Sequence, residues 1–334
     1  MRIVVAHSQL NTFGGGERSV LALLRGLSAR HEVTLWAGNY APDRTYAGLR
    51  AFPRVDVPRT GWVWRTPHAD AVVTHSFGAH LLALRFPRTL CYLHTLRSVY
   101  LDGGSRPDLV ARRWLDGAAV RRAAQVATNS AFTAERARQR YGRAIEVAPP
   151  GADDALFDLP VRTGNYALYV GRLAPEKGVE RLLRWSAELP FDLVLVGAGA
   201  PEYVAHLRSL AGPRAQFRGP LTGDALLAAY VGCRLLAFLP EAEEFGLAAL
   251  EAMAAGKPVV AAPEGGLLEL VDGGRTGLFA RDASEFATAT HSLFASDALA
   301  LQLGHDARER ARAYTWARYV QRIEELCVAM VRGG

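Results

Sequence analysis

The sequence contains almost no lysine, only three cysteines and no long apolar run. No apolar stretch approaches the ~20 residues that a membrane-spanning helix needs. The apolar start at Ile3–Ala6 is also too short for the core of a signal peptide. Cys91, Cys233 and Cys327 are odd in number and far apart, which argues against a disulfide framework or a metal-binding motif. We therefore expect a cytoplasmic protein in a reducing compartment.

Lys177 and Lys257 are the two lysines of the chain, so arginine fills nearly every basic position. The net charge of +6 conceals an asymmetry between the two halves of the sequence. Residues 1–150 hold 21 arginines and 10 acidic residues, a formal charge of +11, whereas residues 151–334 hold 18 basic and 23 acidic residues, a charge of −5. Mutational bias explains the preference for arginine but not the shortage of acidic residues. The asymmetry indicates an anionic partner for the first half.

The 334 residues suggest two domains, and 50% hydrophobic with 22% charged residues is ordinary globular composition. The glycines and prolines follow no period, which excludes collagen-like and low-complexity chains. Both halves alternate short apolar runs with helical periodicity, the pattern of a parallel sheet covered by helices. Pro149-Pro150-Gly151 interrupts that pattern, so we predict an α/β chain of two doubly wound domains with a hinge near residues 149–162.

Particular strands and helices are expected in each half. Strands in the first half are expected at 2–7, 32–36, 71–74, 89–93, 125–128 and 146–148, and helices near 17–29, 79–85, 108–124 and 131–141. Strands in the second half are expected at 166–169, 193–196, 235–238 and 258–261, and helices near 179–188, 203–210, 223–230, 247–255, 284–294 and 316–331.

A glycine loop, Gly14-Gly15-Gly16, separates the first strand, which contains His7, from the first helix. Glycines let backbone amides approach a ligand, and a helix N-terminus offers unpaired N–H donors to an anion. The spacing does not fit a dinucleotide fingerprint or a P-loop. Taken alone, such a run is more often a tight turn than a phosphate site.

A second loop follows the first strand of the second half and contains Gly171, Arg172 and Lys177. Two cations beside a helix N-terminus suit a pyrophosphate, because they neutralise charge as the bond to it breaks. The alternative is a solvated loop with a lysine at the helix entry. The rarity of lysine in this chain favours a function for Lys177.

Acidic residues flank the start of the helix expected at 247–255. Glu243 precedes it and Glu251 lies within it, while Phe245, Gly246 and Leu247 can offer backbone amides to an anion. Two carboxyl groups at a set distance also occur in glycosidases. The neighbouring basic loop makes nucleotide binding the better interpretation.

Glu243 and Glu251, separated by seven residues within Glu-Phe-Gly-Leu…Glu-Ala-Met-Ala-Ala-Gly-Lys-Pro-Val-Val, closely resemble the acidic signature of glycosyltransferase family 4. The resemblance extends over nearly the whole chain and includes the glycine loop, Asn129-Ser130, Pro149-Pro150 and Gly265-Gly266. It implies the GT-B fold: a Rossmann-like domain at 1–150 and a second at 151–313 that face each other across a cleft, with a C-terminal helix at 314–334 that returns to the first domain. It also implies a retaining hexosyltransferase that uses a nucleotide-sugar. The donor it favours is GDP-mannose, as in mannosyltransferase-like members, followed by UDP-glucose or another UDP-sugar.

The resemblance also assigns roles to residues. Arg172 and Lys177 would bind the donor diphosphate and stabilise it as leaving group, Glu251 would hold the ribose, and Glu243 would face the sugar. The backbone at Phe245, Gly246 and Leu247 would contact sugar or phosphate, Gly15 and Gly16 would close on the phosphates from the first domain, and His94 would approach the transferred sugar. Because Glu244 stands where the family often has a small residue, the sugar could instead face Glu244.

Several further expectations follow from the resemblance. The chain lacks the Asp-x-Asp motif that holds a divalent metal in the other main transferase fold, and two cations can do that metal's work, so neither a metal nor another cofactor is expected. The donor phosphate itself would accept the proton of the acceptor hydroxyl during front-face transfer, and domain closure over the hinge would assemble the site. A sugar-nucleotide epimerase of the same fold and a non-catalytic nucleotide-sugar-binding subunit are the alternatives.

The basic first half is where the resemblance places the acceptor, a glycan, a glycolipid or a small molecule. Arg112-Arg113-Trp114, Arg121-Arg122 and the group Arg59, Trp62, Trp64 and Arg65 mix cations with aromatic residues. They suit an anionic or lipid-linked acceptor, or peripheral contact with the anionic inner face of a membrane. Solvated arginines on an ordinary surface are an equal alternative. No nucleic-acid partner is expected, because no nucleic-acid-binding module accompanies the charge.

Overall fold

The computed structural model describes residues 1–58, 61–96 and 107–333. Its internal contacts divide the chain into two compact units. Unit 1 contains Met1–Pro150 and Trp316–Gly334, and unit 2 contains Gly151–Thr315. The chain thus leaves unit 1 after Pro150 and returns to it at Trp316, two residues beyond the expected start of the C-terminal segment.

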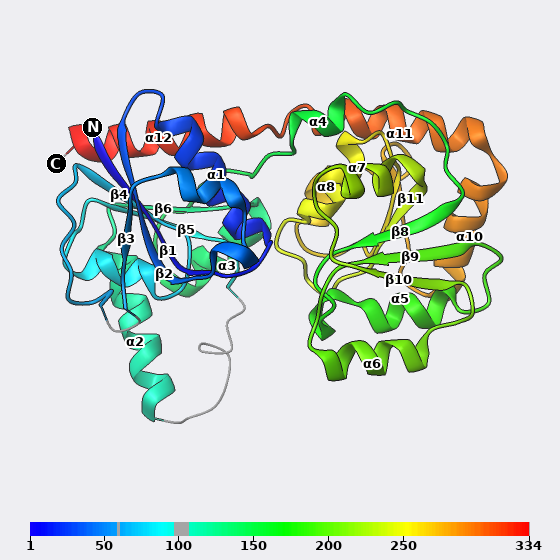
Figure 1. The fold of residues 1–334 in the computed structure, drawn as a ribbon, viewed down its shortest axis with the longest axis horizontal. Helices are drawn as coiled ribbons and strands as arrows, with labels where there is room; N and C mark the ends of the chain where they lie inside the picture. The colour runs from blue at the N-terminus through cyan, green and yellow to red at the C-terminus, as the bar shows by residue number, and fades with distance from the viewer. Residues whose placement is uncertain (59–60, 97–106, 334) are drawn as a thin grey trace. The chain divides into compact units, whose positions relative to one another are not determined.

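A seven-stranded parallel sheet forms the centre of unit 1 (Figure 1). Apolar residues fill its inner strands, which are buried on both faces as in sheets covered by helices on both sides. The strand order is β3-β2-β1-β4-β5-β6-β7. The bounds are β1 (Arg2–Leu10), β2 (Glu32–Tyr40), β3 (Arg54–Asp56), β4 (Ala71–Thr74), β5 (Thr89–Leu93), β6 (Gln125–Thr128) and β7 (Glu146–Val147).

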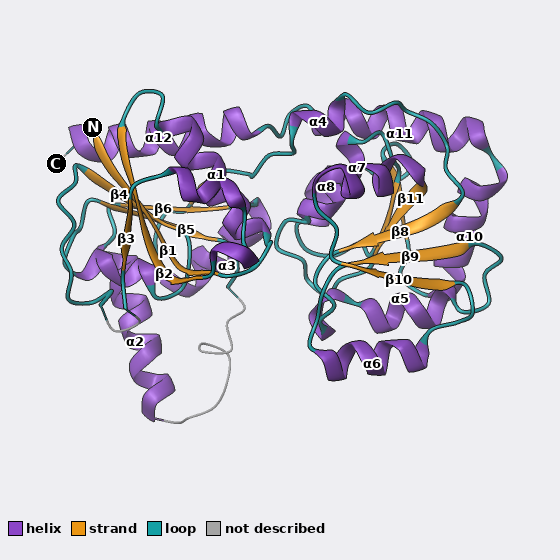
Figure 2. Cartoon of the chain, viewed as in Figure 1, coloured by secondary structure: helices purple, strands orange, loops and turns teal. Residues whose placement is uncertain are grey.

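The helices of unit 1 include the C-terminal helix of the chain, which lies beside α1 (Figure 2). A glycine permits this close packing, because a Cβ at Gly26 would lie 2.6 Å from the Val320 side chain. Tyr319 and Ile323 join the same buried cluster as Leu24. The bounds are α1 (Gly15–Leu27), α2 (Pro107–Arg122), α3 (Ala131–Tyr141) and α12 (Trp316–Arg332), with 3₁₀ helices η1 (Pro42–Arg44), η2 (Ala47–Ala51) and η3 (Ala79–Leu84).

Unit 2 is built on a six-stranded parallel sheet with the order β10-β9-β8-β11-β12-β13. Figure 2 shows α5 and α6 on one side of this sheet and α7 and α8 on the other. The strands are β8 (Tyr166–Val170), β9 (Asp192–Val196), β10 (Ala215–Gly219), β11 (Cys233–Phe238), β12 (Val259–Ala261) and β13 (Gly277–Phe279). The helices are α4 (Asp154–Phe157), η4 (Pro175–Lys177), α5 (Val179–Ser186), α6 (Pro201–Leu210), α7 (Gly223–Gly232), α8 (Leu247–Ala254), α9 (Leu267–Leu270), α10 (Ala283–Ala295) and α11 (Asp297–Ala311).

One of the two lysines belongs to the core of unit 2 rather than to a surface. Lys257 is 1% exposed, and its ammonium donates to the carbonyls of Arg162, Val231 and Cys233 at 2.7, 2.9 and 2.8 Å. A buried cation is tolerated only with such partners. Lys257 therefore joins three segments of the unit and is not available to a ligand. The three cysteines are buried and free.

Both sheets reverse their strand order once, and these reversals predict where ligands bind. Strand order reverses between β1 and β4 in unit 1 and between β8 and β11 in unit 2. In doubly wound folds, the loops at the carboxyl ends of the two strands at this switch point diverge and leave a binding crevice. Each unit thus has one expected binding position, described separately below.

Candidate functional site

The switch point of unit 2 brings together a cation and a carboxylate that the sequence separates by 66 positions. Lys177 ends the short helix η4 after β8, and Glu243 lies in the loop after β11. The Lys177 ammonium donates to Glu243 Oε2 at 2.7 Å, and the two side chains are 20% and 11% exposed. This charged pair is half-shielded from water, so it is stronger than a surface ion pair.

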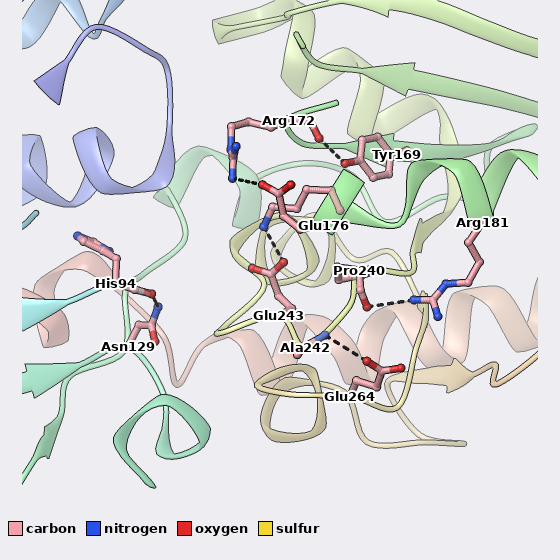
Figure 3. Close-up of polar contacts among 11 residues, drawn as sticks. His94, Asn129, Tyr169, Arg172, Glu176, Arg181, Pro240, Ala242, Glu243 and Glu264 are labelled. Atoms are coloured by element: carbon pink, nitrogen blue, oxygen red, sulfur yellow. Dashed lines mark hydrogen bonds and ion pairs between the residues drawn. The ribbon is translucent and has the colours of Figure 1, made fainter. Parts of the chain in front are cut away.

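Arg172 lies on the same loop but is more exposed. Its guanidinium donates to the Glu176 carboxylate at 2.9 Å, and the Arg172 side chain is 65% exposed (Figure 3). The buried Tyr169 hydroxyl donates to the Arg172 carbonyl at 2.8 Å, which fixes the backbone after β8. The Gly171 N–H donates to the Val196 carbonyl at 3.0 Å. The loop is therefore held at its base by these two hydrogen bonds, while the Arg172 guanidinium is exposed to solvent.

The loop at residues 239–245 is held at several points. Arg181 donates to the carbonyls of Leu239 and Pro240, at 2.5 and 3.2 Å. The Ala242 N–H donates to the Glu264 carboxylate at 3.1 Å (Figure 3). Ala242 has φ +46°, and is the one residue other than glycine with positive φ among those the structure describes. Such strain persists where the surroundings hold it, and it is concentrated at binding sites.

Three glycines let the backbones around this loop approach closely. A Cβ at Gly178 would lie 1.8 Å from the Leu239 carbonyl oxygen, and φ at Gly178 is +65°. A Cβ at Gly265 or Gly266 would lie 2.2 or 2.3 Å from a carbonyl oxygen of the loop, and the Gly266 N–H donates to the Glu243 carbonyl at 2.7 Å. The glycine pair noted in the sequence therefore positions the acidic loop and need not contact a ligand.

Helix α8 begins directly after the acidic loop. Gly246 precedes it in the left-handed region, φ +94°, Leu247 is its first residue, and the Phe245 ring packs inward against Tyr314. Glu251 is only 5% exposed, and its Oε2 accepts a hydrogen bond of 2.8 Å from the Tyr230 hydroxyl of α7. The carboxylate is thus anchored on one oxygen, a feature that the sequence did not reveal.

Three histidines gather at the switch point of unit 1. His7 lies near the end of β1, His75 follows β4, and His94 follows β5, three neighbouring strands of the sheet. His75 Nδ1 lies 2.9 Å from His94 Nε2, and the Tyr319 hydroxyl of α12 lies 3.2 Å from His75 Nε2. The sequence identified His7 and His94 but not His75 or Tyr319. One signal was present, since His75 directly follows a predicted buried strand.

Burial keeps these imidazoles neutral. Desolvation lowers the pKa of His7 to about 4, and desolvation together with the nearby His7 lowers the pKa of His94 to about 3. The pKa of His75 lies well below its ordinary value for the same reason, with His94 and His7 adding to the shift. At neutral pH each ring therefore carries one N–H and one lone pair.

The glycine loop before α1 is occupied by the chain's own carboxylate. Glu17 is 6% exposed, and its carboxylate accepts hydrogen bonds from the Thr12 hydroxyl and from the backbone of Thr12 and Gly14. Burial raises the pKa of Glu17, and these hydrogen bonds oppose the rise. Gly15 is the first residue of α1, and a Cβ at Gly16 would lie 3.4 Å from His7 Nε2. A phosphate at this position would have to share the donors with Glu17.

Asn129 supports the backbone that carries His94. Its Nδ2 donates to the His94 carbonyl at 2.8 Å, as Figure 3 shows. Ser130 caps α3, accepting from the Thr133 N–H at 3.0 Å. The Asn129-Ser130 pair in the sequence is therefore a support for the histidine segment and a helix cap.

Of the aromatic residues expected on the basic surface, some are exposed and one is buried. On α2, Val110 and Trp114 are 53% and 67% exposed. Trp64 is 70% exposed, with the Arg85 guanidinium 5.7 Å above its ring. Trp62, by contrast, is buried at 2%, so the expectation that it shares this surface is wrong, because its side chain packs into the core beside Val57. Arg59 lies outside the described residues.

The described residues contain neither a cluster of metal-ligating side chains nor a membrane-spanning helix. No group of three or more histidine, cysteine, aspartate or glutamate side chains is arranged to hold a metal ion, and the three histidines of unit 1 do not form such a group. In the same part of the chain, no helix combines the length and the apolar character that crossing a bilayer requires.

Family models match both halves of the chain. Residues 13–156 match the model described as Glycosyltransferase Family 4, and residues 164–296 match the model described as Glycosyl transferases group 1. The D-inositol 3-phosphate glycosyltransferase of Salinispora tropica is 32% identical over an alignment 350 positions long, which covers 90% of this chain and 72% of the relative. The chain belongs to glycosyltransferase family 4.

This family 4 chain is also 31% identical over 271 residues to the D-inositol 3-phosphate glycosyltransferase of Corynebacterium glutamicum. That alignment covers 70% of this chain and 64% of the relative, so the chain spans about two thirds of the length of these curated relatives. Solved structures share its fold. Anabaena HepE in complex with UDP and glucose gives a TM-score of 0.80 at 22% identity, covering 96% of this chain and 98% of HepE.

The sucrose-phosphate synthase of Thermosynechococcus elongatus also gives a TM-score of 0.80 at 22% identity, covering 100% of both chains. At this identity the similarity concerns the fold alone. It confirms the expected GT-B class, with two Rossmann-like units on seven-stranded and six-stranded parallel sheets.

Proposed function

We propose that this family 4 chain is a retaining glycosyltransferase that moves a hexosyl unit from a nucleoside-diphosphate sugar to an acceptor hydroxyl. The observation that carries the proposal is the Lys177–Glu243 pair at the switch point of unit 2, with Arg172 on the same loop. A lysine and an arginine beside a sugar-binding carboxylate are what a sugar diphosphate requires: two positive charges for the phosphates and an acceptor for a sugar hydroxyl.

In this proposal the acceptor oxygen forms a bond to the anomeric carbon on the face from which the diphosphate departs. The acceptor proton moves to the departing phosphate oxygen. Lys177 and Arg172 stabilise the negative charge that collects on the diphosphate, which is the usual task of a divalent metal in such reactions. Transfer should therefore continue in the presence of a chelator such as EDTA.

The remaining side chains have supporting roles. Glu251, held by Tyr230, accepts a hydrogen bond from the ribose, and the backbone at Gly246 and Leu247 contacts sugar or phosphate. Glu243 is the carboxylate that faces the sugar, a role its pairing with Lys177 favours over Glu244. His94 contacts the transferred sugar as a neutral imidazole, because its low pKa prevents it from acting as a cationic acid at neutral pH.

The donor base and sugar are best tested directly. GDP-mannose is the first donor proposed, followed by UDP-glucose and other UDP-sugars, and the UDP complex of Anabaena HepE supports including the UDP-sugars in the test. Ligand binding raises the unfolding temperature according to affinity and concentration. A thermal-shift series of nucleotides and nucleotide-sugars, followed by turnover of each binder with and without acceptor, identifies the donor. Conversion of the sugar without acceptor would indicate the epimerase instead, and binding without any conversion would indicate a non-catalytic subunit.

We propose an anionic acceptor, such as a phosphorylated polyol or a lipid-linked phosphate. Unit 1 carries the basic half of the chain, and the relatives in Salinispora tropica and Corynebacterium glutamicum are named for a phosphorylated inositol. Inorganic phosphate should then inhibit transfer competitively with acceptor, and a neutral analogue of the acceptor should react at least 10-fold more slowly. Equal rates with neutral and phosphorylated acceptors would contradict the proposal.

We also propose that α2 makes peripheral contact with an anionic membrane at its cytoplasmic face. Trp114 and Val110 expose apolar surface on this helix, which also carries Arg112 and projects from unit 1 in Figure 1. Co-sedimentation with vesicles of 30% phosphatidylglycerol should fall with added salt and with Trp114→Ala. Binding that is absent, or equal to neutral vesicles, would assign the exposed arginines to the acceptor or to solvent.

A further inference from the structure

His7 has one proton that the rest of the described chain does not use. The Gln9 N–H donates to His7 Nδ1 at 3.2 Å, so this nitrogen carries the lone pair of the ring, and the neutral imidazole has its proton on Nε2. Among the residues that the structure describes, no group accepts a hydrogen bond from His7 Nε2. Because His7 is only 7% exposed, this donor needs an acceptor from outside the chain.

The Nε2 atom of His7 is directed at the first turn of α1. The position that a Cβ would take at Gly16 lies 3.4 Å from His7 Nε2 and 3.8 Å from His94 Nε2. His94 Nε2 is already engaged, since it lies 2.9 Å from His75 Nδ1. Of the two imidazoles that border Gly16, His7 is therefore the one whose Nε2 is left for a ligand.

The first turn of α1 supplies further donors. The first hydrogen bond at this end of the helix runs from the Arg18 N–H to the Gly14 carbonyl at 3.1 Å. The N–H groups of Gly15 and Gly16 precede it, so they have no carbonyl to pair with inside the helix. The 13 residues of α1 also direct a partial positive charge to this end. Together with His7 Nε2, these groups form a set of N–H donors beside one turn.

The Glu17 carboxylate lies at the beginning of the glycine loop. Its Oε1 accepts a hydrogen bond from the Thr12 hydroxyl, and its Oε2 lies 2.6 Å from the position that a Cβ would take at Gly14. Burial raises the pKa of Glu17, which favours its uncharged form. A ligand beside Gly16 and the Glu17 carboxylate therefore divide the donors of the loop between them.

We propose that His7 is a phosphate-binding residue of unit 1, and that its Nε2–H and the N–H groups of Gly15 and Gly16 donate to the oxygens of one phosphate group. Ionised phosphate oxygens only accept hydrogen bonds, which matches a set of donors, and residues 1–150 carry a formal charge of +11. The source of the phosphate rests on the proposed function: either the nucleoside-diphosphate donor or a phosphorylated acceptor.

Long-range ¹H–¹⁵N correlation of the imidazoles tests the contact in the full chain without turnover. The His7 signals are assigned by their loss in His7→Gln. We expect the proton of wild-type His7 on Nε2, and a shift of the Nε2 signal when inorganic phosphate, UDP, GDP or the phosphorylated acceptor binds. A proton on Nδ1, or an Nε2 signal that none of these compounds changes, would overturn the inference.

Two substitutions of His7 separate the hydrogen bond from the loss of the ring. Glutamine places an amide N–H near the position of the imidazole Nε2, whereas the shorter asparagine reaches only the position of Nδ1. His7→Asn should weaken phosphate binding about 10-fold, and His7→Gln should remain within about 3-fold of the wild-type affinity. Equal affinities in these two variants would show that the Nε2 proton does not bind the ligand.

Gly16→Ala should affect stability and binding in opposite directions. Its methyl would meet His7 Nε2 at 3.4 Å, an ordinary contact, and alanine favours a helix more than glycine does. We expect an equal or higher unfolding temperature and phosphate binding at least 10-fold weaker, because the methyl covers the donors. Gly117→Ala in α2 is the matched control, since its methyl would meet only the flexible end of Arg121, and its phosphate affinity should be unchanged. Wild-type affinity in folded Gly16→Ala would contradict the proposal.

Steady-state kinetics identify the source of the phosphate. If the donor supplies it, His7→Asn raises the donor KM and weakens UDP or GDP binding, while the acceptor KM stays near the wild-type value. If the acceptor supplies it, His7→Asn raises the acceptor KM and weakens inhibition by inorganic phosphate. Transfer with both KM values unchanged in His7→Asn would overturn the inference alone. Phosphate binding at His7 in a protein that transfers no sugar would overturn the proposed function alone.

Discussion

At the residue scale, the central feature of unit 2 is a cation that already has an anionic partner. Lys177 is bonded to Glu243 in a half-shielded position, so a diphosphate cannot gain the full attraction of the ammonium without weakening that bond. Under the proposed function, Glu243 thus competes with the phosphate for the Lys177 ammonium. The same proposal has a bound donor release the Glu243 carboxylate, which can then accept from a sugar hydroxyl.

This competition predicts opposite effects of two substitutions. Glu243→Gln should strengthen the binding of a free nucleoside diphosphate by roughly 3- to 10-fold, because the ammonium is released, while turnover of the sugar donor falls. Lys177→Met should weaken diphosphate binding by at least ~30-fold, the loss of one charge-assisted bond of about 2 kcal/mol. Isothermal titration calorimetry measures both. Weaker diphosphate binding by Glu243→Gln would show that the carboxylate does not compete.

Gly178 is the residue where the backbone leaves no room for a side chain. Gly178→Ala should lower the stability of unit 2 by roughly 3 kcal/mol, because it combines a left-handed conformation with a clash against the Leu239 carbonyl. Gly219 is the control, since its φ of +68° is nearly the same but nothing lies within 4 Å of its Cβ position. Gly219→Ala should cost only about 1 kcal/mol, the conformational part. Equal losses in chemical denaturation would mean that the close approach at Gly178 relaxes at no cost.

At the element scale, the loop between β11 and α8 depends on a contact that holds a strained residue. The Glu264 carboxylate accepts from the N–H of Ala242, where φ is +46°. Glu264→Ala should release this turn, raise the donor KM about 3- to 10-fold through the displaced Glu243, and destabilise unit 2 by about 1 to 2 kcal/mol. Glu264→Gln keeps an acceptor oxygen, so its donor KM and the stability of its unit 2 should remain close to the wild-type values. Unchanged donor kinetics in Glu264→Ala would show that the loop is fixed by its glycine and arginine contacts alone.

Most elements could be predicted from the sequence where their signals are local. β4, β5, β6 and α3 have the predicted bounds, because each is a short apolar run or an amphipathic segment between clear turn residues. The segment predicted as a helix near 79–85 is instead the 3₁₀ helix η3. Helix α11 was not predicted. Its interior Gly304 weakens helical propensity, and only the fold explains that glycine, because a Cβ there would lie 2.3 Å from the Gly256 carbonyl oxygen.

The candidate site was predictable in its residues but not in its pairings. The sequence placed Lys177 and Glu243 in separate motifs, and their bond exists because β8 and β11 are neighbours in the sheet. His75 and Tyr319 lie 244 positions apart, and each alone has the pattern of an ordinary core residue. Contacts of this kind depend on strand order and helix return, which no local pattern contains.

At the scale of the whole molecule, the charge asymmetry becomes sharper when counted by unit. Unit 1 contains 24 basic and 12 acidic residues, a formal charge of +12, and unit 2 contains 15 basic and 21 acidic residues, a charge of −6. Helix α12 adds to the basic side when it joins unit 1. The two units should thus differ in their response to pH, since unit 1 also contains the buried neutral histidines.

Because burial lowers the pKa values of the three histidines, we predict that unit 1 loses stability as the pH falls below 6.5. Above that pH the imidazoles are neutral in both the folded and the unfolded chain, so they do not contribute. Between pH 6.5 and about 4 the unfolded chain binds protons that folded His7 does not, and stability falls by up to ~1.4 kcal/mol per pH unit for each such histidine. His94 extends the same loss to about pH 3.

Trp185→Phe makes this loss measurable in unit 1 alone. Trp185 is the single tryptophan of unit 2, and the other five belong to unit 1, so the fluorescence of this variant reports urea unfolding of unit 1. In this background, His7→Gln should reduce the slope of unfolding free energy against pH between pH 6 and 4.5. The reduction should equal the contribution of one bound proton, about 1.4 kcal/mol per pH unit. His206→Gln, at an exposed position of unit 2, should leave the slope unchanged. The slope of unfolding free energy against pH could instead be equal in Trp185→Phe and in the two histidine variants made in that background. That result would mean that His7 is protonated in the folded chain and that the cluster at the switch point is open to water.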